Sequence, residues 1–560
     1  MEKKSFLLGC FTSLSVLIII LIVTILLIFL GIKNKLSDIP IVSDSSYIEI
    51  SITTEIKEYN NIDFYDNTPS VKKITEKIIS AKDDDRVHGL ILKFVSPLSL
   101  GYSSVREFSE AIKIFKKSNK KVYAYIDFAM DRDYLLATVS DRIALNPSAS
   151  AGILLRGISV QNIYLKEFLN RLGIEIKVLK TGKAKSFGEI FTDTLMSRDT
   201  KENYKVVFGN FFNEIKDEIV SNRKIKNIKD IYQNRDRLII NSFYAIDLSL
   251  VDTLTYYKDF LVKNSIQNKI NIVDYTPKVI EEKEDKIAVV YLSGEIIGSN
   301  NETGYLNTIS KNKIESILDQ IDENEKIKAI VLRINSGGGS SLEADIILNQ
   351  VLSKVDLPLV ISMGDIAASG AYYISSKADY IFADVFTITG SIGVFSLFPY
   401  ADELANKMGL NSDGIKFGEF SNIFNPFQTP NKNHLKIYQA QIEDVYNDFK
   451  KNVATGRNMS MLEVERNSQG LIFTGKMAKE RGLVDEVGTL YDAIDKASQL
   501  AKIDEFSIVY YPRKKSILEY IMDPLSLIGL IQNKSLNELK LFVKNILFQK
   551  TQTYQNIEVK

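Results

Sequence analysis

The feature that most constrains the fold is a pattern of apolar segments that occurs twice, about 240 residues apart. In each copy an unbroken apolar run typical of a buried strand is followed by apolar residues at helical spacing and then by another strand. Strand–helix–strand order predicts a parallel sheet with right-handed crossovers. We therefore expect two copies of one α/β domain. The first copy comprises residues 87–95, 105–117 and 121–126, and the second comprises residues 327–334, 342–351 and 357–362.

Single residues recur in the same register. The set Tyr134, Asp141, Ile143, Gly152 and 250–252 of the first copy matches Tyr372, Asp379, Ile381, Gly390 and 483–485 of the second. A chain of 560 residues is long enough for two to four domains. The predicted organisation is an N-terminal stub, membrane anchor and linker (1–45), a first half (46–266), a polar linker (267–285), a second half (286–505) and a C-terminal extension (506–560).

Residues 5–32 contain no charged side chain, and this stretch exceeds the roughly 20 residues that a helix needs to cross a bilayer. We expect one uncleaved transmembrane helix. A cleaved signal peptide is the alternative, but its apolar run would be only about 7–15 residues long. Cys10 precedes the apolar run instead of following it, which does not fit a lipoprotein cleavage site. Lysines flank the segment on both sides, so charge alone leaves its orientation open.

Composition excludes several classes of function. Lys+Arg and Asp+Glu are equal at 70 each, and this balance argues against a nucleic-acid-binding protein. Two histidines and one cysteine cannot supply a zinc site rich in these ligands. We expect no metal and no cofactor.

The two halves differ in a glycine loop. Residues 335–340 read Asn-Ser-Gly-Gly-Gly-Ser, after a buried strand and before a helix. Such a loop presents backbone N–H groups that can hold a developing oxyanion. The alternatives are a plain tight turn or a phosphate cradle, although the Lys-Ser/Thr pair of a P-loop is missing.

Ser369 follows a strand of the second half and is flanked by small residues. Its spacing alone favours an ordinary N-cap serine, and a nucleophile at a helix start is the alternative. A nucleophile needs a base. His88 begins a core strand and His434 lies in a polar helix start, so neither resembles a placed base. A lysine remains, and burial can keep its amine neutral.

Together, residues 335–340, 364–373, 389–393, 182–186 and 482–485 resemble the signal peptide peptidase A family in its long, two-half form. The resemblance implies tandem domains with a fold like that of Clp protease and crotonase, and a Ser–Lys dyad split between the halves. It assigns the catalytic roles to Ser369 as nucleophile and Lys185 as base. Gly338 and Gly370 would supply the oxyanion N–H groups, and Ser391 would orient the lysine.

The family also implies a setting. The chain would be a membrane-anchored serine endopeptidase that hydrolyses signal-peptide remnants and other hydrophobic peptides. It would be a single-pass protein of the cytoplasmic (inner) membrane with its catalytic part on the periplasmic side. It would form a homo-oligomer, by resemblance a tetramer.

Several alternatives stay open. Lys180 and Lys183 lie close to Lys185 and are rival bases. Gly337 stands where the family usually has proline, which predicts a more flexible loop. Asp131 takes the place of Ser369 in the first half, and Ser421 lies near the place of Lys185 in the second. A non-catalytic membrane scaffold and an acyl-CoA enzyme on the same fold are the competing functions.

Overall fold

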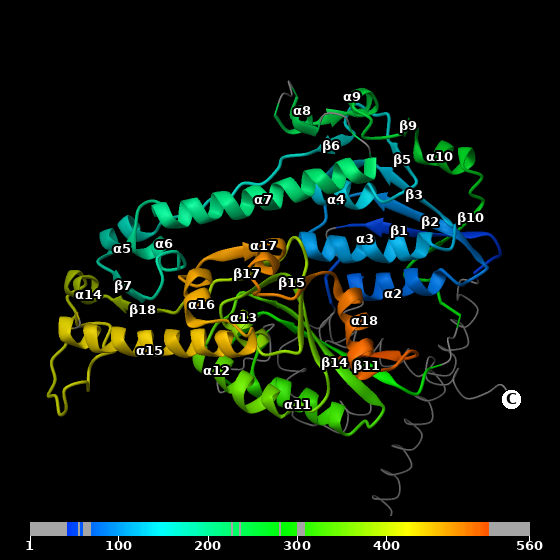
Figure 1. Ribbon diagram of the computed structural model, residues 1–560. Helices are drawn as coiled ribbons and strands as arrows, with labels where there is room; N and C mark the ends of the chain where they lie inside the picture. The colour runs from blue at the N-terminus through cyan, green and yellow to red at the C-terminus, as the bar shows by residue number, and fades with distance from the viewer. Residues whose placement is uncertain are drawn as a thin grey trace, which may run out of the picture.

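The computed structural model describes residues 42–53, 56–59, 69–223, 225, 228–233, 237–278, 282–299, 308–429 and 431–513 (Figure 1). The predicted transmembrane segment, residues 5–32, lies outside these ranges. Within them, no helix combines the length and the apolar character needed to cross a membrane.

The first half is built on a parallel sheet of six strands in the order β10-β1-β2-β3-β5-β9. A small sheet β4-β6-β8 continues from one end of it. The strands are β1 (Ser46–Ile52), β2 (Val87–Phe94), β3 (Lys121–Ile126), β4 (Phe128–Met130), β5 (Arg142–Leu145), β6 (Gly152–Leu154), β8 (Ile240–Asn241), β9 (Thr253–Leu254) and β10 (Asn268–Asn271). The helices are α2 (Val71–Ala81), α3 (Tyr102–Lys116), α4 (Asp131–Ala137), α8 (Ile228–Gln233), α9 (Ser242–Asp247) and α10 (Tyr257–Lys263).

The second half repeats this order. Its sheet runs β19-β17-β15-β14-β11-β21, and β16 and β20 continue from β15. The strands are β11 (Lys286–Ser293), β14 (Ile327–Ser336), β15 (Leu359–Ala368), β16 (Tyr380–Ala383), β17 (Ile388–Gly390), β19 (Ile472–Thr474), β20 (Glu486–Val487) and β21 (Ser507–Tyr511), with β12 (Glu295–Ile296) and β13 (Thr308–Ile309) forming a separate pair. The helices are α11 (Lys311–Asp322), α12 (Ser341–Ile346), a π turn (Ile347–Val351), a 3-10 turn (Leu352–Lys354), α13 (Gly370–Ser375), α16 (Met461–Asn467), α17 (Gly475–Glu480) and α18 (Leu490–Ala501).

The prediction of an α/β fold with parallel sheets is confirmed. One detail differs from the expected boundaries. Strand β10 lies in the stretch predicted as a linker and β21 lies in the predicted C-terminal extension, yet both are edge strands that pair in parallel with the first strand of their half. Each repeat therefore ends one strand later than the sequence pattern indicates.

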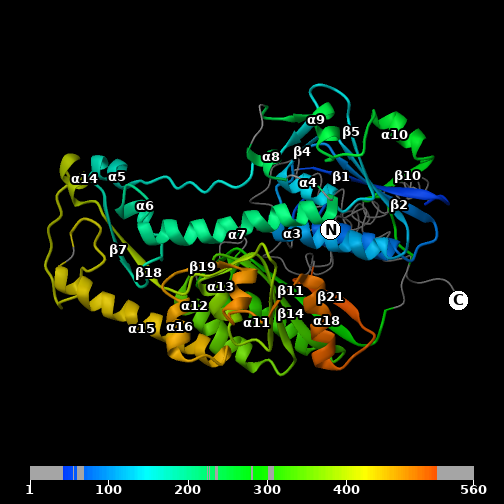
Figure 2. The same ribbon diagram turned by 45° about the horizontal axis from the view of Figure 1, so that its top comes forward.

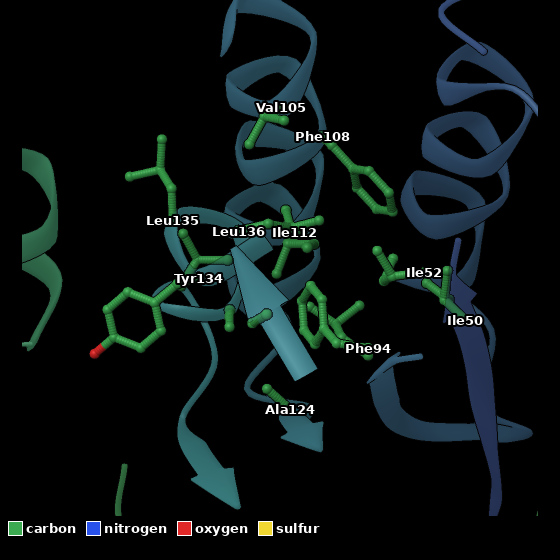
Figure 3. Packing of buried hydrophobic residues seen from close by; sticks show 14 of the residues in the cluster. Ile50, Ile52, Phe94, Val105, Phe108, Ile112, Ala124, Tyr134, Leu135 and Leu136 are labelled. Atoms are coloured by element: carbon green, nitrogen blue, oxygen red, sulfur yellow. The ribbon is translucent and has the colours of Figure 1, made fainter. Parts of the chain in front are cut away.

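Alternating apolar residues explain why each sheet can be buried between helices. In the first half, Ile50 and Ile52 of β1 and Phe94 of β2 are fully buried. They face Phe108 and Ile112, which lie one turn apart on α3 (Figure 3). Spacing of two along the strands and four along the helix thus places all five side chains in one core.

The duplication extends to individual hydrogen bonds. The buried hydroxyl of Tyr134 donates to the carbonyl of Leu250 at 2.8 Å. In the second half, the buried hydroxyl of Tyr372 donates to the carbonyl of Leu483 at 2.9 Å. Tyr134 and Tyr372, which match in the two sequence copies, therefore make equivalent hydrogen bonds in the two halves.

From each half a long excursion extends beyond its sheet, and the two excursions meet at one side of the molecule (Figures 1 and 2). Strand β7 of the first half pairs antiparallel with β18 of the second. On α7, the Asn203 amide bonds the backbone of Ile472 in both directions, at 3.0 and 3.1 Å. These excursions comprise α5 (Lys166–Leu172), β7 (Glu175–Lys180), α6 (Glu189–Thr192) and α7 (Arg198–Arg223) from the first half, and β18 (Phe395–Tyr400), α14 (Asp402–Lys407) and α15 (Lys432–Gly456) from the second.

A buried charge cluster also joins the halves. Arg333 on β14 is 1% exposed. Its guanidinium lies 3.1 Å from the carboxylate of Glu58 and 3.0 Å from that of Glu107, both in the first half. The same guanidinium donates to Ser362 and to the carbonyl of Met363, each at 3.1 Å. Because a buried charge is tolerated only when it is paired, this cluster ties the two halves together.

Candidate active site

Ser369 lies at the junction between β15 and α13, where a strand turns directly into a helix. Its backbone has φ 56° and ψ −122°, a conformation that residues other than glycine rarely adopt. Its N–H donates to the carbonyl of Gly390 at 2.9 Å, which holds the turn in place. Backbone strain of this kind is characteristic of functional sites.

Lys185 reaches this serine from the first half. Its Nζ lies 2.9 Å from the Oγ of Ser369, 3.0 Å from the Oγ of Ser391 and 2.9 Å from the carbonyl oxygen of Ser391. All three residues belong to the same chain, so the arrangement forms within one subunit. The structure thus brings together three residues that the sequence separates by 184 and 206 positions.

The environment of Lys185 makes its amine unusual. The residue is only 4% exposed. Burial lowers its pKa from 10.5 to about 7, because a charged ammonium loses its hydration there. No carboxylate is bonded to its amine in the described part of the chain, so no counter-charge opposes this effect. A large fraction of Lys185 is therefore neutral near neutral pH and can accept a proton.

The two rival lysines are placed differently. The amine of Lys180 lies 3.6 Å from the buried carboxylate of Glu189 and donates to the carbonyl of Lys185 at 3.2 Å. The side chain of Lys183 is exposed. Neither lies in the position that Lys185 occupies beside Ser369.

Glu189 anchors the segment that carries Lys185. Its buried carboxylate accepts hydrogen bonds from the hydroxyls of Ser197 and Thr200 at 2.7 and 2.9 Å. These two residues precede and begin α7, the helix that rests on the second half. The lysine is thereby fixed to a rigid element, although its segment is otherwise a loop.

The glycine loop lies directly against the serine. Gly338 has φ +100°, and a Cβ built on it would lie 2.7 Å from the nitrogen of Gly370 and 2.9 Å from the Cβ of Ser369. Only glycine fits, for both steric and conformational reasons. The N–H of Gly338 donates to the Oγ of Ser336 at 3.1 Å in this state. The two predicted oxyanion glycines therefore adjoin, with one N–H engaged by a neighbouring hydroxyl.

Sequence reasoning missed a second clamp on the lysine. A Cβ on Gly470, which has φ +75°, would lie 2.4 Å from the backbone nitrogen of Lys185. The carbonyl of Gln469 accepts the N–H of Ala184 at 2.9 Å, and that of Leu471 accepts the N–H of Ser391 at 2.7 Å. The segment 469–471 thus fixes the backbones around Lys185 and Ser391 relative to each other. A single glycine between Gln469 and Leu471 gives no signal for this role.

The first half has no equivalent arrangement at its matching position. The carboxylate of Asp131, which stands where Ser369 does in the repeat, accepts the N–H groups of Arg156 and Gly157 at 3.0 Å each. Ser421, near the repeat position of Lys185, is exposed and bonds the carbonyl of Gly418. His434 is buried in α15, and its Nε2 lies 3.6 Å from the carboxylate of Glu419.

A strained serine at a strand-to-helix turn, packed closely against a glycine loop, defines a serine hydrolase on an α/β fold. A cavity of about 480 Å³ opens at Ser369 and Gly370, large enough for a substrate side chain. Groups of at least three His, Cys, Asp or Glu side chains that could hold a metal are absent from the described residues.

The chain belongs to peptidase family S49, whose model matches residues 114–271 and 352–504. It is therefore a serine protease. It is 34% identical over 467 residues to "Protease 4" of Haemophilus influenzae, covering 78% of this chain and 74% of that protein. It is 29% identical to "Protease 4" of Salmonella typhi, covering 82% and 76%. It is 30% identical to "Serine protease SPPA, chloroplastic" of Arabidopsis thaliana, covering 78% and 66%. The predicted resemblance to the long, two-half form of signal peptide peptidase A is confirmed.

Proposed function

We propose that this protease hydrolyses peptide bonds with Ser369 as nucleophile and neutral Lys185 as general base. The observation that carries the proposal is the 2.9 Å contact between the amine of Lys185 and the hydroxyl of Ser369, at a buried position that lowers the lysine pKa to about 7. A base with a pKa near the working pH transfers protons most effectively.

In the proposed reaction, Lys185 takes the hydroxyl proton while Ser369 Oγ bonds to the peptide carbonyl carbon. The oxyanion accepts hydrogen bonds from the N–H groups of Gly370 and Gly338. The N–H of Gly338 must first release the Oγ of Ser336, to which it donates in the structure. Lys185 then gives its proton to the departing amine, and the C–N bond breaks. In the second stage Lys185 activates water, which releases the acyl group and restores the serine.

Ser391 is proposed to orient the amine. Its hydroxyl and carbonyl both accept from Lys185, and its φ of 54° shows that the backbone is held in a strained conformation to do so. A neutral amine has two N–H groups and one lone pair. If the two N–H groups donate to the hydroxyl and the carbonyl of Ser391, the lone pair can point to the hydroxyl of Ser369.

The remaining parts of the proposal come from the family resemblance. We place the protein in the cytoplasmic membrane, anchored by residues 5–32, with its catalytic part outside the cytoplasm. We propose a homo-oligomer, a tetramer by resemblance, and signal-peptide remnants and other hydrophobic peptides as substrates. The uncharged length of residues 5–32 supports the anchor.

The test is peptide hydrolysis by the full-length chain in detergent, compared with Ser369→Ala, Lys185→Ala and the double variant. We expect each single variant to lose at least ~10³ of kcat, and the double variant to lose little more, because residues that act as one unit are not additive. Circular dichroism checks that all four proteins are folded. If Lys185→Ala keeps most of its rate while Ser369→Ala does not, the base has been assigned wrongly.

A further inference from the structure

The cavity beside Ser369 has a mixed character that the proposed function does not explain. Most of its wall is apolar, but the carboxylates of Asp345 and Asp448 also line it. Lysine and arginine are absent from the described residues that line it. The apolar part is formed by Leu342, Tyr373, Val394, Phe395, Val445 and Phe449.

Asp345 is held in a fixed orientation. Its Oδ1 accepts the hydroxyl of Tyr373 at 2.6 Å and the amide of Asn349 at 2.7 Å. The amide of Asn452 donates in turn to the Tyr373 hydroxyl at 2.7 Å. Tyr373 lies one helical turn after Ser369, so this network ties the carboxylate to the nucleophile's helix. An ionised carboxylate has about four acceptor positions, so two donors leave room for a further one.

Two lysines lie near the rim. The amine of Lys451 is 3.3 Å from Asp448, but their side chains are 68% and 64% exposed, and such pairs contribute little. The amine of Lys377 bonds the side-chain oxygen of Asn349 at 2.8 Å. Neither of these two lysines lines the cavity. Asp345 and Asp448 are its charged lining residues, and the amine of Lys185 lies 2.9 Å from the Oγ of Ser369.

Chemistry indicates which substrate residue enters this space. When Ser369 Oγ bonds to a peptide carbonyl, the carbonyl carbon carries the Cα of its own residue, and the side chain starts one bond further on. That side chain must therefore lie beside Ser369 and Gly370, where the cavity opens. We infer that the cavity takes a lysine or arginine side chain of the residue that supplies the scissile carbonyl.

The shape of these side chains matches the walls. Lysine and arginine lay an apolar stem along apolar surface and carry the charge at the tip. The stem would contact Phe395 and Phe449, and the tip would meet Asp345 and Asp448. The inference deepens the proposed function, on which it rests. The substrates would be apolar peptides that contain a basic residue or end at one. The junction between the basic and apolar regions of a signal peptide is such a sequence.

The test uses the full-length chain and three peptides that differ only in the residue before the scissile bond, which is lysine, leucine or glutamate. Cleavage positions are read by mass spectrometry. We expect kcat/KM for the lysine peptide to exceed that for the glutamate peptide by at least about tenfold, and to exceed that for the leucine peptide, because a fixed polar partner discriminates strongly between side chains.

Variants assign the effect to the two aspartates. Asp345→Asn and Asp448→Asn should each lower the lysine-to-leucine ratio of kcat/KM by about three- to tenfold. Asparagine at 345 still offers an oxygen to the Tyr373 hydroxyl, and Asp448 is exposed, so both variants should fold. Asp444→Asn is the matched control, because Asp444 is exposed on the same helix and lies outside the cavity. It should leave the ratio unchanged.

The outcomes separate the two proposals. If cleavage requires Ser369 but leucine is preferred, and the aspartate variants leave the ratio unchanged, the cationic pocket is overturned while the proposed mechanism stands. If Ser369→Ala cleaves all three peptides at the parent rate, both the mechanism and the pocket are overturned.

Discussion

At the scale of single residues, the proposed mechanism depends on a lysine whose pKa is lowered because the residue is buried. Lys185 has hydroxyl and carbonyl partners and no carboxylate bonded to it, so desolvation alone sets its pKa. A histidine base would need a further residue to hold its ring in the correct tautomer, and a lysine base does not. The buried lysine instead makes the activity sensitive to anything that admits water or charge to the amine.

The first prediction concerns pH. Because only neutral Lys185 can accept a proton, kcat/KM should rise with pH and reach half of its plateau at about pH 7, the pKa of the buried amine. Lys185→Arg should remove at least ~10³ of the rate at every pH, since a guanidinium cannot be deprotonated in this range. Lys183→Arg, two residues away with an exposed side chain, is the control and should keep the parent profile. A profile flat from pH 5 to 9 would contradict a lysine base.

The second prediction concerns Gly337, where the family resemblance implies proline. An added Cβ at Gly337 would meet nothing within 4 Å, and Ser336 before it is in strand β14, an extended conformation that suits a residue preceding proline. Gly337→Pro should therefore stabilise the protein by about 0.4–1 kcal/mol, because the unfolded chain loses freedom. Denaturant unfolding of parent, Gly337→Pro and Gly337→Ala measures the change. Lower stability for the proline variant would show that the loop needs a backbone that proline cannot adopt.

At the scale of elements, the site is assembled by contacts between segments that are far apart in sequence. Strands β7 and β18 pair across the two halves, and this pairing leads directly into the lysine segment. The N–H of Thr181 continues the ladder by bonding the carbonyl of Val394 at 2.9 Å. The segment 469–471 then closes over Lys185 and Ser391 from the other side.

The third prediction tests this clamp. Gly470→Ala would drive a methyl group to within 2.4–2.7 Å of the backbone and Cβ of Lys185, so the lysine segment must shift. A displacement of that size should lower kcat by about 10²-fold with a smaller effect on KM, since it moves a reacting group and not the substrate cavity. Gly409→Ala is the matched control: Gly409 has nearly the same positive φ, +74°, but open space around it.

Gly409→Ala should therefore show only the cost of the strained backbone and keep its kcat. Equal losses in the two variants would mean that Gly470 matters for its conformation and not for its contact with Lys185.

These elements also mark the limit of what the sequence predicts. The repeat was predictable, because buried strands and an amphipathic helix leave apolar patterns that can be matched over 240 positions, as at 87–95 and 327–334. Ser369, Gly338 and Lys185 were found through motifs. The pairing of β7 with β18 and the contact of Gly470 with Lys185 were not predicted, because neither depends on a local pattern. The edge strands β10 and β21 were missed for the same reason.

At the scale of the whole molecule, the halves are joined by buried polar contacts as well as by apolar packing. Phe386 of the second half lies in the core of the first, and Val207 of the first lies in the core of the second. Arg333 adds a charge from β14 that meets two carboxylates of the other half. Because Lys185 and Ser369 also lie on opposite halves, the relative placement of the halves is part of the site.

The fourth prediction follows from this junction. Arg333→Met should destabilise the protein by about 3–5 kcal/mol, because it leaves the carboxylates of Glu58 and Glu107 buried without their partner. Lys476→Met is the control: its amine also crosses between halves, to Glu214, but it is 55% exposed, and its loss should cost less than about 1 kcal/mol. Chemical denaturation of both variants gives the comparison. Similar small losses in both would show that the buried cluster does not hold the halves together.

The separation of Lys185 from Ser369 has a consequence for the way the protein is made. A growing polypeptide leaves the ribosome from its N-terminus, and domains fold as they emerge. The proposed base appears 184 residues before the proposed nucleophile, and the clamp at Gly470 is translated later still. Translation order would thus delay proteolysis: until residues 369–470 have been made and have folded onto the first half, the nascent chain carries the proposed base without the nucleophile and clamp that it needs.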